Sequence, residues 1–361
     1  MGCVAQAGDA AGGAHETSGW RSPGSGWGPL LLAQLPATRG LRFVTYMLLL
    51  VGMASLGAAS SSDSVVGAHA DVTLPSHRGR SLLANYYFRV EKNVTVGTAN
   101  KSFSAPTCIA SDDAGNVYLT DQNNKRVQKL SSDGNPILDW GSDQTAPNAI
   151  GTGLGITVVG SYVFVADYAA GTIKKFDTTG VYITEWDPAL TFVYALCHDA
   201  DGYLYAADFR GGAIKKFDPN RSPPSDPLWT QSGLPFADPI GCAVVGSTLV
   251  VSYQTENAIQ LLKTSDGTPL TSFNTTGALQ TYAVAAAGDG TFFYASLSPS
   301  FSDNEVQQVS LDGTAIAASV GFAGTRFFPV GMTVQPQTGD PQRIYVTSNF
   351  ASAVYILTRD L

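Results

Sequence analysis

The sequence predicts an all-β fold made of a repeated four-stranded unit. Between residues 106 and 130, short apolar and β-branched runs alternate with turns rich in Asp, Asn and Gly, which is typical of a strand meander. In five of six copies, a β-branched residue of the third strand follows six residues after the end of the second strand. These third-strand residues are 46, 41, 45, 47 and 48 residues apart and are Val127, Ile173, Ile214, Ile259, Val306 and Val354. Four short strands at this period predict a six-bladed β-propeller.

The chain of 361 residues divides into four segments by composition. Residues 1–40 are rich in Gly, Ala, Ser and Pro and are expected to be disordered. Residues 41–60 contain the apolar run Phe43 to Ala59 after Arg39 and Arg42, which indicates a signal peptide or, alternatively, a signal anchor. Residues 61–83 are interpreted as a linker, and residues 84–361 as the propeller.

An exported protein is also favoured by Asn-x-Ser/Thr triplets, the acceptors of N-linked glycans. They begin at Asn93, Asn100, Asn220 and Asn274, in predicted turns or near strand ends. We therefore expect a secreted or extracytoplasmic glycoprotein, with a type II membrane-anchored form as the alternative. Whether the apolar segment is cleaved, and which oligomeric state forms, do not follow from the sequence.

The cysteines are expected to be buried thiols because Cys108, Cys197 and Cys242 fall in small, apolar first strands. A bridge between Cys197 and Cys242 is the alternative, and it needs a Cα separation below about 7 Å.

The last copy of the unit ends after three strands, at Leu361. The run Asn85 to Val90 is a strong strand pattern that lies ahead of the first copy. An unpaired edge loses a ladder of hydrogen bonds and favours aggregation. Residues Tyr86 to Val90 are therefore predicted to pair with Val354 to Leu357 and close the ring.

Large aromatic residues end the predicted outer strands. They are Trp140, Trp186 and Trp229, with Phe273 in the fourth copy. Because sheets packed face to face around an axis leave more volume at the rim, these side chains are expected in the core between blades.

The first unit resembles the NHL repeat, through Pro106, Asp112, Gly115, Asn116, Asp121, Asn124, Arg126, Val127, Gln128, Lys129 and Leu130. The third copy preserves Asp199, Gly202, Asp208, Ile214, Lys215, Lys216 and Phe217, and the second keeps Asp167, Ile173, Lys174, Lys175 and Phe176. The later copies replace the strand-ending Asp by Tyr253, Ser296 and Ser348. The resemblance implies a six-bladed ring and leaves the activity open, because one fold hosts many functions.

Metal chemistry of the kind found in related propeller enzymes has few candidate ligands here. Only His198 lies in the propeller region, which excludes a site of several His such as peptide-amidating lyases hold, and His198 is interpreted as a surface hairpin residue. Asp121, Asp167 and Asp208 end the second strand in three blades. They are candidates for binding at a channel mouth, where a divalent cation would be the cofactor, but the favoured interpretation is that each accepts hydrogen bonds from its own turn.

Electrostatics disfavour nucleic acid as a partner, because the net charge is −8. A basic stripe on the third strands, formed by Arg126, Lys129, Lys174, Lys175, Lys215 and Lys216, is interpreted as a solvated blade edge. The sequence thus favours a binding or scaffold module for a protein, peptide or glycan, and does not identify the ligand or the face that binds it. The alternative is a metal-dependent propeller enzyme, a lyase or lactone hydrolase, with its site in the central channel.

Overall fold

The computed structural model describes residues 87–95, 102–221, 226–275, 280–298, 304–316, 320–322, 327–335 and 342–360. Residues 1–86, which include the predicted signal segment and linker, and Asn100 lie outside these ranges. In the described part of the chain, no helix is long and apolar enough to cross a bilayer.

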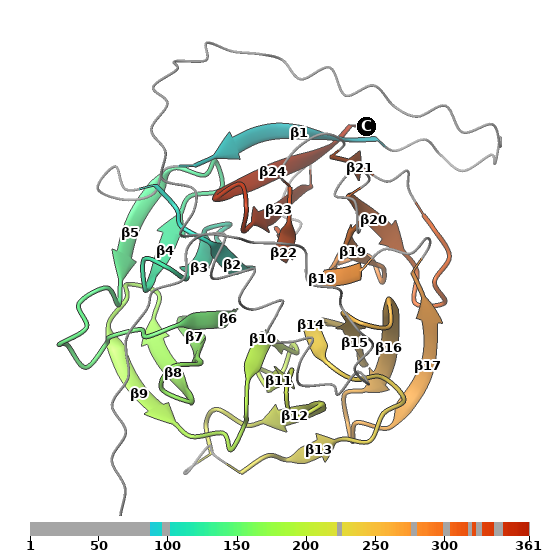
Figure 1. Cartoon of the computed structure of the whole chain (residues 1–361), viewed down its shortest axis with the longest axis horizontal. Helices are drawn as coiled ribbons and strands as arrows, with labels where there is room; N and C mark the ends of the chain where they lie inside the picture. The colour runs from blue at the N-terminus through green and yellow to red at the C-terminus, as the bar shows by residue number, and fades with distance from the viewer. Residues whose placement is uncertain are drawn as a thin grey trace, which may run out of the picture. The chain divides into compact units, whose positions relative to one another are not determined.

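Within the described ranges, the strands form six antiparallel sheets of four strands each around a central axis (Figure 1). The first three blades are β2 Pro106–Ser111, β3 Val117–Asp121, β4 Arg126–Leu130 and β5 Pro136–Trp140; β6 Gly153–Val159, β7 Tyr162–Asp167, β8 Thr172–Asp177 and β9 Tyr182–Trp186; and β10 Val193–His198, β11 Leu204–Asp208, β12 Ala213–Phe217 and β13 Trp229–Gln231. The next two are β14 Pro239–Val245, β15 Thr248–Tyr253, β16 Ala258–Lys263 and β17 Pro269–Asn274; and β18 Gln280–Ala286, β19 Phe292–Leu297, β20 Glu305–Val309 and β21 Val320–Gly321. The all-β, six-bladed prediction is confirmed.

The sixth blade joins the two ends of the described chain. It consists of β22 Pro329–Val334, β23 Arg343–Ser348, β24 Ala353–Asp360 and, as its outer strand, β1 Tyr87–Val94. Strand β1 runs antiparallel to β24, with Val90 opposite Leu357 and Val94 opposite Val354. Closure of the last blade by this segment is confirmed for the described residues, but its register differs from the prediction. Only Val90 of the predicted segment lies opposite Val354 to Leu357, because the strand continues four residues further and Lys92 to Val94 pair with the rest of that range.

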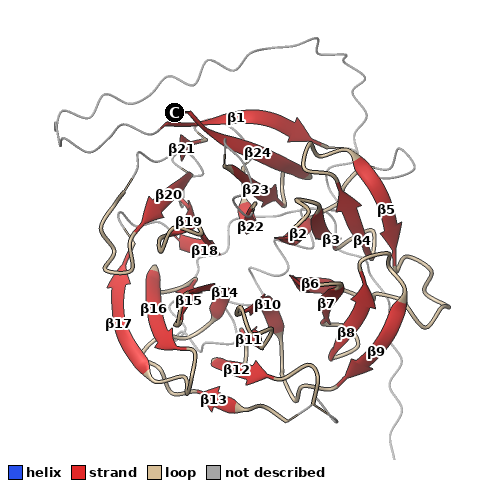
Figure 2. Ribbon diagram, turned by 180° about the vertical axis from the view of Figure 1, so that it is seen from behind, coloured by secondary structure: helices blue, strands red, loops and turns tan. Residues whose placement is uncertain are grey.

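First strands face the axis and fourth strands form the rim, as both views show (Figures 1 and 2). The core lies between blades, in clusters that combine one face of each sheet with the opposing face of its neighbour. Trp140 and Trp186 are both 6% exposed and fill such interfaces, as predicted. Trp229 is half-buried and lies opposite Lys216, two residues from Ile214, the position that corresponds to the partners of Trp140 and Trp186.

A glycine in the following blade makes room for each of three outer aromatics. A Cβ on Gly180 would stand 2.9 Å from Trp140, one on Gly267 2.8 Å from Trp229, and one on Gly313 2.9 Å from Phe273. All three glycines have positive φ, so they also serve the turns between third and fourth strands. The sequence pattern of turn Gly and outer aromatic therefore encodes contacts between neighbouring blades.

Candidate functional site

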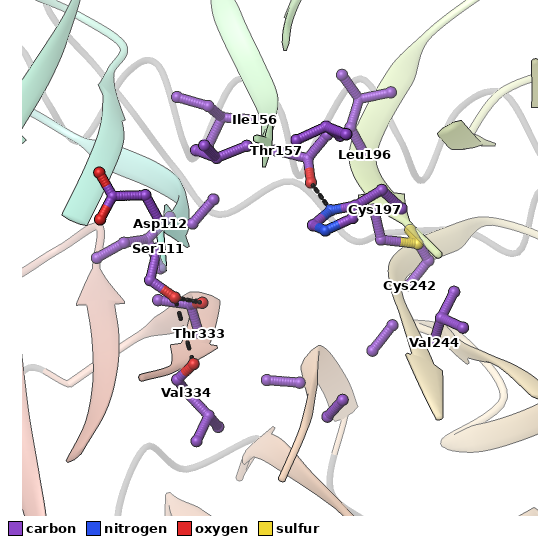
Figure 3. Close-up of a pocket in the computed structure, with 18 of the residues that line it drawn as sticks. Ser111, Asp112, Ile156, Thr157, Leu196, Cys197, Cys242, Val244, Thr333 and Val334 are labelled. Carbon is purple, nitrogen blue, oxygen red and sulfur yellow. Dashed lines mark hydrogen bonds between the residues drawn. A yellow bond between two sulfur atoms is a disulfide. The ribbon is translucent and has the colours of Figure 1, made fainter. Parts of the chain in front are cut away.

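The candidate site is a cavity of about 440 Å³ at one mouth of the channel (Figure 3). Its walls are the closing residues of the first strands and the hairpin turns that follow them. The lining comprises residues 109–113, 156–160, 196–200, 242–244, 284–286 and 332–334, so all six blades contribute. Small-molecule sites in proteins have volumes of this order.

The polar side chains of the lining come from blades 1, 2, 3 and 6, where they lie among apolar residues such as Ile156 and Leu196, whereas blades 4 and 5 contribute apolar residues alone. Blades 1, 2 and 3 provide Ser111, Asp112, Asp113, Thr157, His198 and Asp199. The side chains that blades 4 and 5 provide are Cys242, Ala243, Val244, Val284, Ala285 and Ala286. None of the described residues that line the cavity is Lys or Arg. The cavity therefore offers carboxylates and hydroxyls opposite an aliphatic wall.

His198 is a half-buried part of this lining and not a solvated hairpin residue, which corrects the interpretation from sequence. It ends the first strand of blade 3, and its Nδ1 lies 2.8 Å from Thr157 Oγ1 of blade 2 (Figure 3). Burial lowers the pKa of the imidazole, while Asp199 and Asp113 act in the opposite direction. At neutral pH the imidazole is therefore uncharged.

The two hairpin carboxylates in blades 1 and 3 have different partners. Asp112 accepts hydrogen bonds from the backbone and side-chain amides of Asn116 and from the hydroxyl of Tyr118, at 2.8 to 2.9 Å. Asp199 accepts the hydroxyl of Tyr205 at 2.6 Å and forms an ion pair with Lys216 at 3.3 Å. The donors to Asp112 are neutral, whereas a cation compensates Asp199.

A disulfide forms one part of the cavity wall and joins Cys197 to Cys242 with a Cα separation of 5.8 Å. The expectation of buried thiols is wrong for this pair, because adjacent first strands near the axis come close enough for a bridge. Cys108 is a buried free thiol, and burial raises its pKa to about 12. The disulfide covalently ties blade 3 to blade 4.

The three predicted carboxylates Asp121, Asp167 and Asp208 lie near the opposite mouth. Each is paired with the beginning of its first strand, at Pro106, Gly153 and Val193, whereas the cavity lies at the ends of those strands. All three carboxylates are buried. The structure therefore separates them from His198.

Each of these carboxylates accepts hydrogen bonds from backbone amides. Asp208 accepts the amides of Thr191 at 3.0 Å, Phe192 at 2.9 Å and Gly211 at 3.0 Å. Asp167 likewise accepts the amides of Gly151 and Thr152 and forms an ion pair with Lys174.

Asp121 accepts the amide of Ser104 at 2.7 Å and pairs with Arg126 at 2.8 Å. The donors thus come from the loop that enters the blade as well as from the turn that the sequence suggested. Among the described residues, no group of three or more His, Cys, Asp or Glu side chains is arranged to hold a metal ion.

The predicted basic stripe is for the most part not a solvated edge. Arg126 is 2% exposed, between Asp121 and Asp139, and Lys174 is 6% exposed, between Asp167 and Glu185. Lys175 lies 4.0 Å from the ring centre of Tyr162. The interpretation fails because these side chains lie against the neighbouring loops and strands, which supply carboxylates and aromatic faces.

Sequence reasoning missed the cavity residues Ser111, Asp113, Thr157 and Thr333 as a set. The signal that finds them is positional, since in blades 1, 2 and 6 they lie near the end of the first strand or, for Asp113, in the hairpin that follows it. Aligning the six units on that point would have gathered them into a ring. Their chemistry alone, three hydroxyls and a carboxylate among many in the chain, gave no indication.

Comparison with known proteins supports the repeat and the fold. Residues 103–130 match the NHL repeat model. No curated protein matches the chain.

Among solved structures, a virginiamycin B lyase from Staphylococcus aureus is similar with a TM-score of 0.55 at 14% identity, over 76% of this chain and 99% of that one. A streptogramin B lyase is similar with a TM-score of 0.54 at 13% identity, over 76% and 98%.

The PQQ-bound aldose sugar dehydrogenase from Streptomyces coelicolor is similar with a TM-score of 0.53 at 15% identity, over 77% of this chain and 99% of that one. At these identities the likeness concerns the fold alone. Together with the six closed blades, it shows that the chain is a six-bladed β-propeller, in which residues 103–130 match the NHL repeat.

Proposed function

We propose that this protein is an extracytoplasmic binding module whose ligand occupies the cavity at the channel mouth. The observation that carries the proposal is the sided lining of that cavity, with polar groups from blades 1 to 3 opposite the aliphatic wall of blades 4 and 5. Apolar walls with a few convergent polar groups are the usual composition of ligand sites. A peptide segment or a glycan of small size fits a volume of about 440 Å³.

Location outside the cytosol is supported by two features. The disulfide between Cys197 and Cys242 is of a kind that persists in oxidising compartments. Asn93, Asn220 and Asn274 are exposed, so glycans on them would not disturb packing. Expression in secreting cells tests this: we expect protein in the medium whose mass falls after enzymatic removal of N-linked glycans, and intracellular unglycosylated protein would contradict it.

The binding role is tested by filling the cavity. Val244 is a half-buried residue of the aliphatic wall, and Val244→Trp adds a ring into the space. In a thermal-shift screen of peptides, oligosaccharides and small molecules, a ligand at 100 times its Kd stabilises the native state by about 2.7 kcal/mol. We expect ligands that raise the Tm of the wild type but not of Val244→Trp, provided that the variant itself melts cooperatively. Equal shifts in both proteins would refute a ligand in this cavity.

A metal-dependent enzyme, a lyase or lactone hydrolase, is the second candidate because solved propellers of similar fold include enzymes named as lyases and a dehydrogenase. Asp121, Asp167 and Asp208 would then bind a divalent cation. The separate substitutions of these residues by Asn distinguish the candidates. If the protein is a metal-dependent enzyme, these variants should lose bound metal or activity. If the carboxylates only accept backbone amides, the variants should lose stability alone.

A further inference from the structure

We propose that the ligand of the channel-mouth cavity is an amphipathic organic cation, an ammonium or guanidinium group on an aliphatic stem. The inference rests on the proposed binding function and specifies the chemistry of its ligand.

The charge of the lining is the first argument. Asp112 and Asp113 come from the first hairpin of blade 1, and Asp199 comes from that of blade 3. Asp199 is compensated by Lys216, but the hydrogen-bond donors to Asp112 are neutral. Since none of the described lining residues is Lys or Arg, Asp112 and the exposed Asp113 give this rim of the cavity a negative charge that attracts a positive group.

The acceptors in the lining give the second argument. Ser111 Oγ lies 3.1 Å from Thr333 Oγ1 and donates to the carbonyl of Val334 at 3.2 Å. His198 Nδ1 and Thr157 Oγ1 share a hydrogen bond of 2.8 Å, and in the tautomer with the proton on Nδ1 the Nε2 atom is an acceptor. An ammonium carries three donors and no acceptor, so it matches hydroxyl, imidazole and carboxylate acceptors.

The third argument is the aliphatic wall, which favours a ligand whose charged group is carried on an apolar stem. Val244 and Ala286 are half-buried residues of the wall that blades 4 and 5 form, which offers no polar side chain to the cavity. Lys and Arg side chains, and alkylamines, bury their methylene groups on such surfaces while the charged end reaches polar partners. A purely hydrophilic cation would leave this wall without a partner.

The imidazole makes binding of a cation depend on pH. The charged groups around His198 are Asp199 on its own hairpin and Asp113 and Asp112 on blade 1, and its neighbour on blade 2 is Thr157. Protonation turns Nε2 into a donor and adds a positive charge beside the ligand. A cation is therefore released on acidification, whereas a neutral ligand is not repelled.

Calorimetric titration of the full chain with matched probes tests the proposal. The cationic probe is Nα-acetyl-L-lysine amide, and the neutral probe of the same shape is Nα-acetyl-L-norleucine amide. At pH 7.5 we expect the lysine probe to bind about tenfold more tightly. Pentylamine, which carries the side chain without a backbone, tells whether the cation is recognised as a free amine or only as part of a peptide.

Two variants locate the charge that is responsible. Asp113→Asn keeps the shape of an exposed hairpin residue and should weaken lysine-probe binding about fivefold. Asp226→Asn removes one charge from an exposed residue outside the lining and should leave the affinity unchanged. At pH 5.0 the wild type should lose affinity for the lysine probe, and His198→Asn, which keeps a polar atom near Thr157, should lose much less.

Failure of this inference is distinguishable from failure of the proposed function. Equal affinities for the lysine and norleucine probes, no effect of Asp113→Asn, or no measurable binding of either cationic probe would overturn the cation. The binding module would then still stand if other ligands stabilise the wild type but not Val244→Trp, and it falls if none does.

Discussion

In blades 1, 2, 3 and 6, a single side chain at the end of the second strand fixes the loop that enters the blade. Asp208 accepts two amides from the loop between blades 2 and 3 and one amide from its own turn. In blade 6 the repeat has Ser348 at this point, and its hydroxyl accepts the amide of Phe328 in the preceding loop at 2.9 Å. The recurrence of Asp at this position thus reflects the need of buried amides for acceptors, which explains its spacing without any ligand.

Asp208→Asn tests this role. Asn has the same shape as Asp, but an NH₂ group replaces one of the two carboxylate oxygens. This group cannot accept a hydrogen bond from the backbone N–H that faces it. We expect a loss of about 2 kcal/mol in the free energy of unfolding, measured with denaturant, because a buried donor loses its partner.

The control for that measurement is Asp201→Asn, a change of the same kind in an exposed turn of the same blade. It should cost less than about 0.5 kcal/mol. Equal effects of the two substitutions would contradict the assignment of Asp208 to the loop.

At the scale of the element, β1 replaces the outer strand that the last copy of the repeat lacks. Its last residue, Val94, is 7% exposed and packs in the cluster that contains Val117, Leu130 and Ile356. A Cβ on Gly134 would stand 2.6 Å from Val94, just as one on Gly180 would meet Trp140. Strand β1 therefore supplies both the missing ladder and the side chain that fills the wedge toward blade 1.

Introducing a charge at Val94 should open this closure. For Val94→Asp we expect a loss of about 3 kcal/mol in unfolding free energy, since a carboxylate would be buried among aliphatic side chains. Val90→Asp on the same strand is the matched control, because Val90 is 38% exposed. If denaturant unfolding gave the same midpoint for both variants, β1 would not be packed as described.

At the scale of the whole molecule, stability depends on the contacts between neighbouring blades. Three second strands use a hydroxyl for this: Thr120 donates to the carbonyl of Leu154, Ser252 to that of Tyr282, and Thr347 to that of Thr107. Blades 2 and 3 have Ala166 and Ala207 in this position, and the interface between blades 3 and 4 carries the disulfide between Cys197 and Cys242. The bridge therefore adds a covalent tie at an interface that lacks this hydroxyl.

Removal of the disulfide should weaken the ring as a whole. For the double substitution Cys197→Ser and Cys242→Ser, chain-entropy arguments for a loop of this length give a loss of about 4 kcal/mol. A reductant should lower the Tm of the wild type but leave that of the double variant unchanged. A wild-type Tm that did not respond to full reduction would show that the blades hold without the bridge.

The sequence by itself determined the number of blades, the order of strands and the closure by β1. These features follow from local patterns, namely period-2 runs, turn residues and a missing last strand, which any compact arrangement of this chain must satisfy. It also placed Trp140 and Trp186 between blades, because large aromatics at a rim have one favourable environment.

Only the tertiary structure decided which residues meet across blades. The bond between Cys197 and Cys242 and the position of His198 beside Thr157 depend on distances between strands about 40 residues or more apart in sequence. The cavity arises in the same way, since each blade contributes a few ordinary residues and the ring gathers them at one mouth. A repeat pattern specifies each blade locally, whereas a site at the axis exists only after six blades have closed around it.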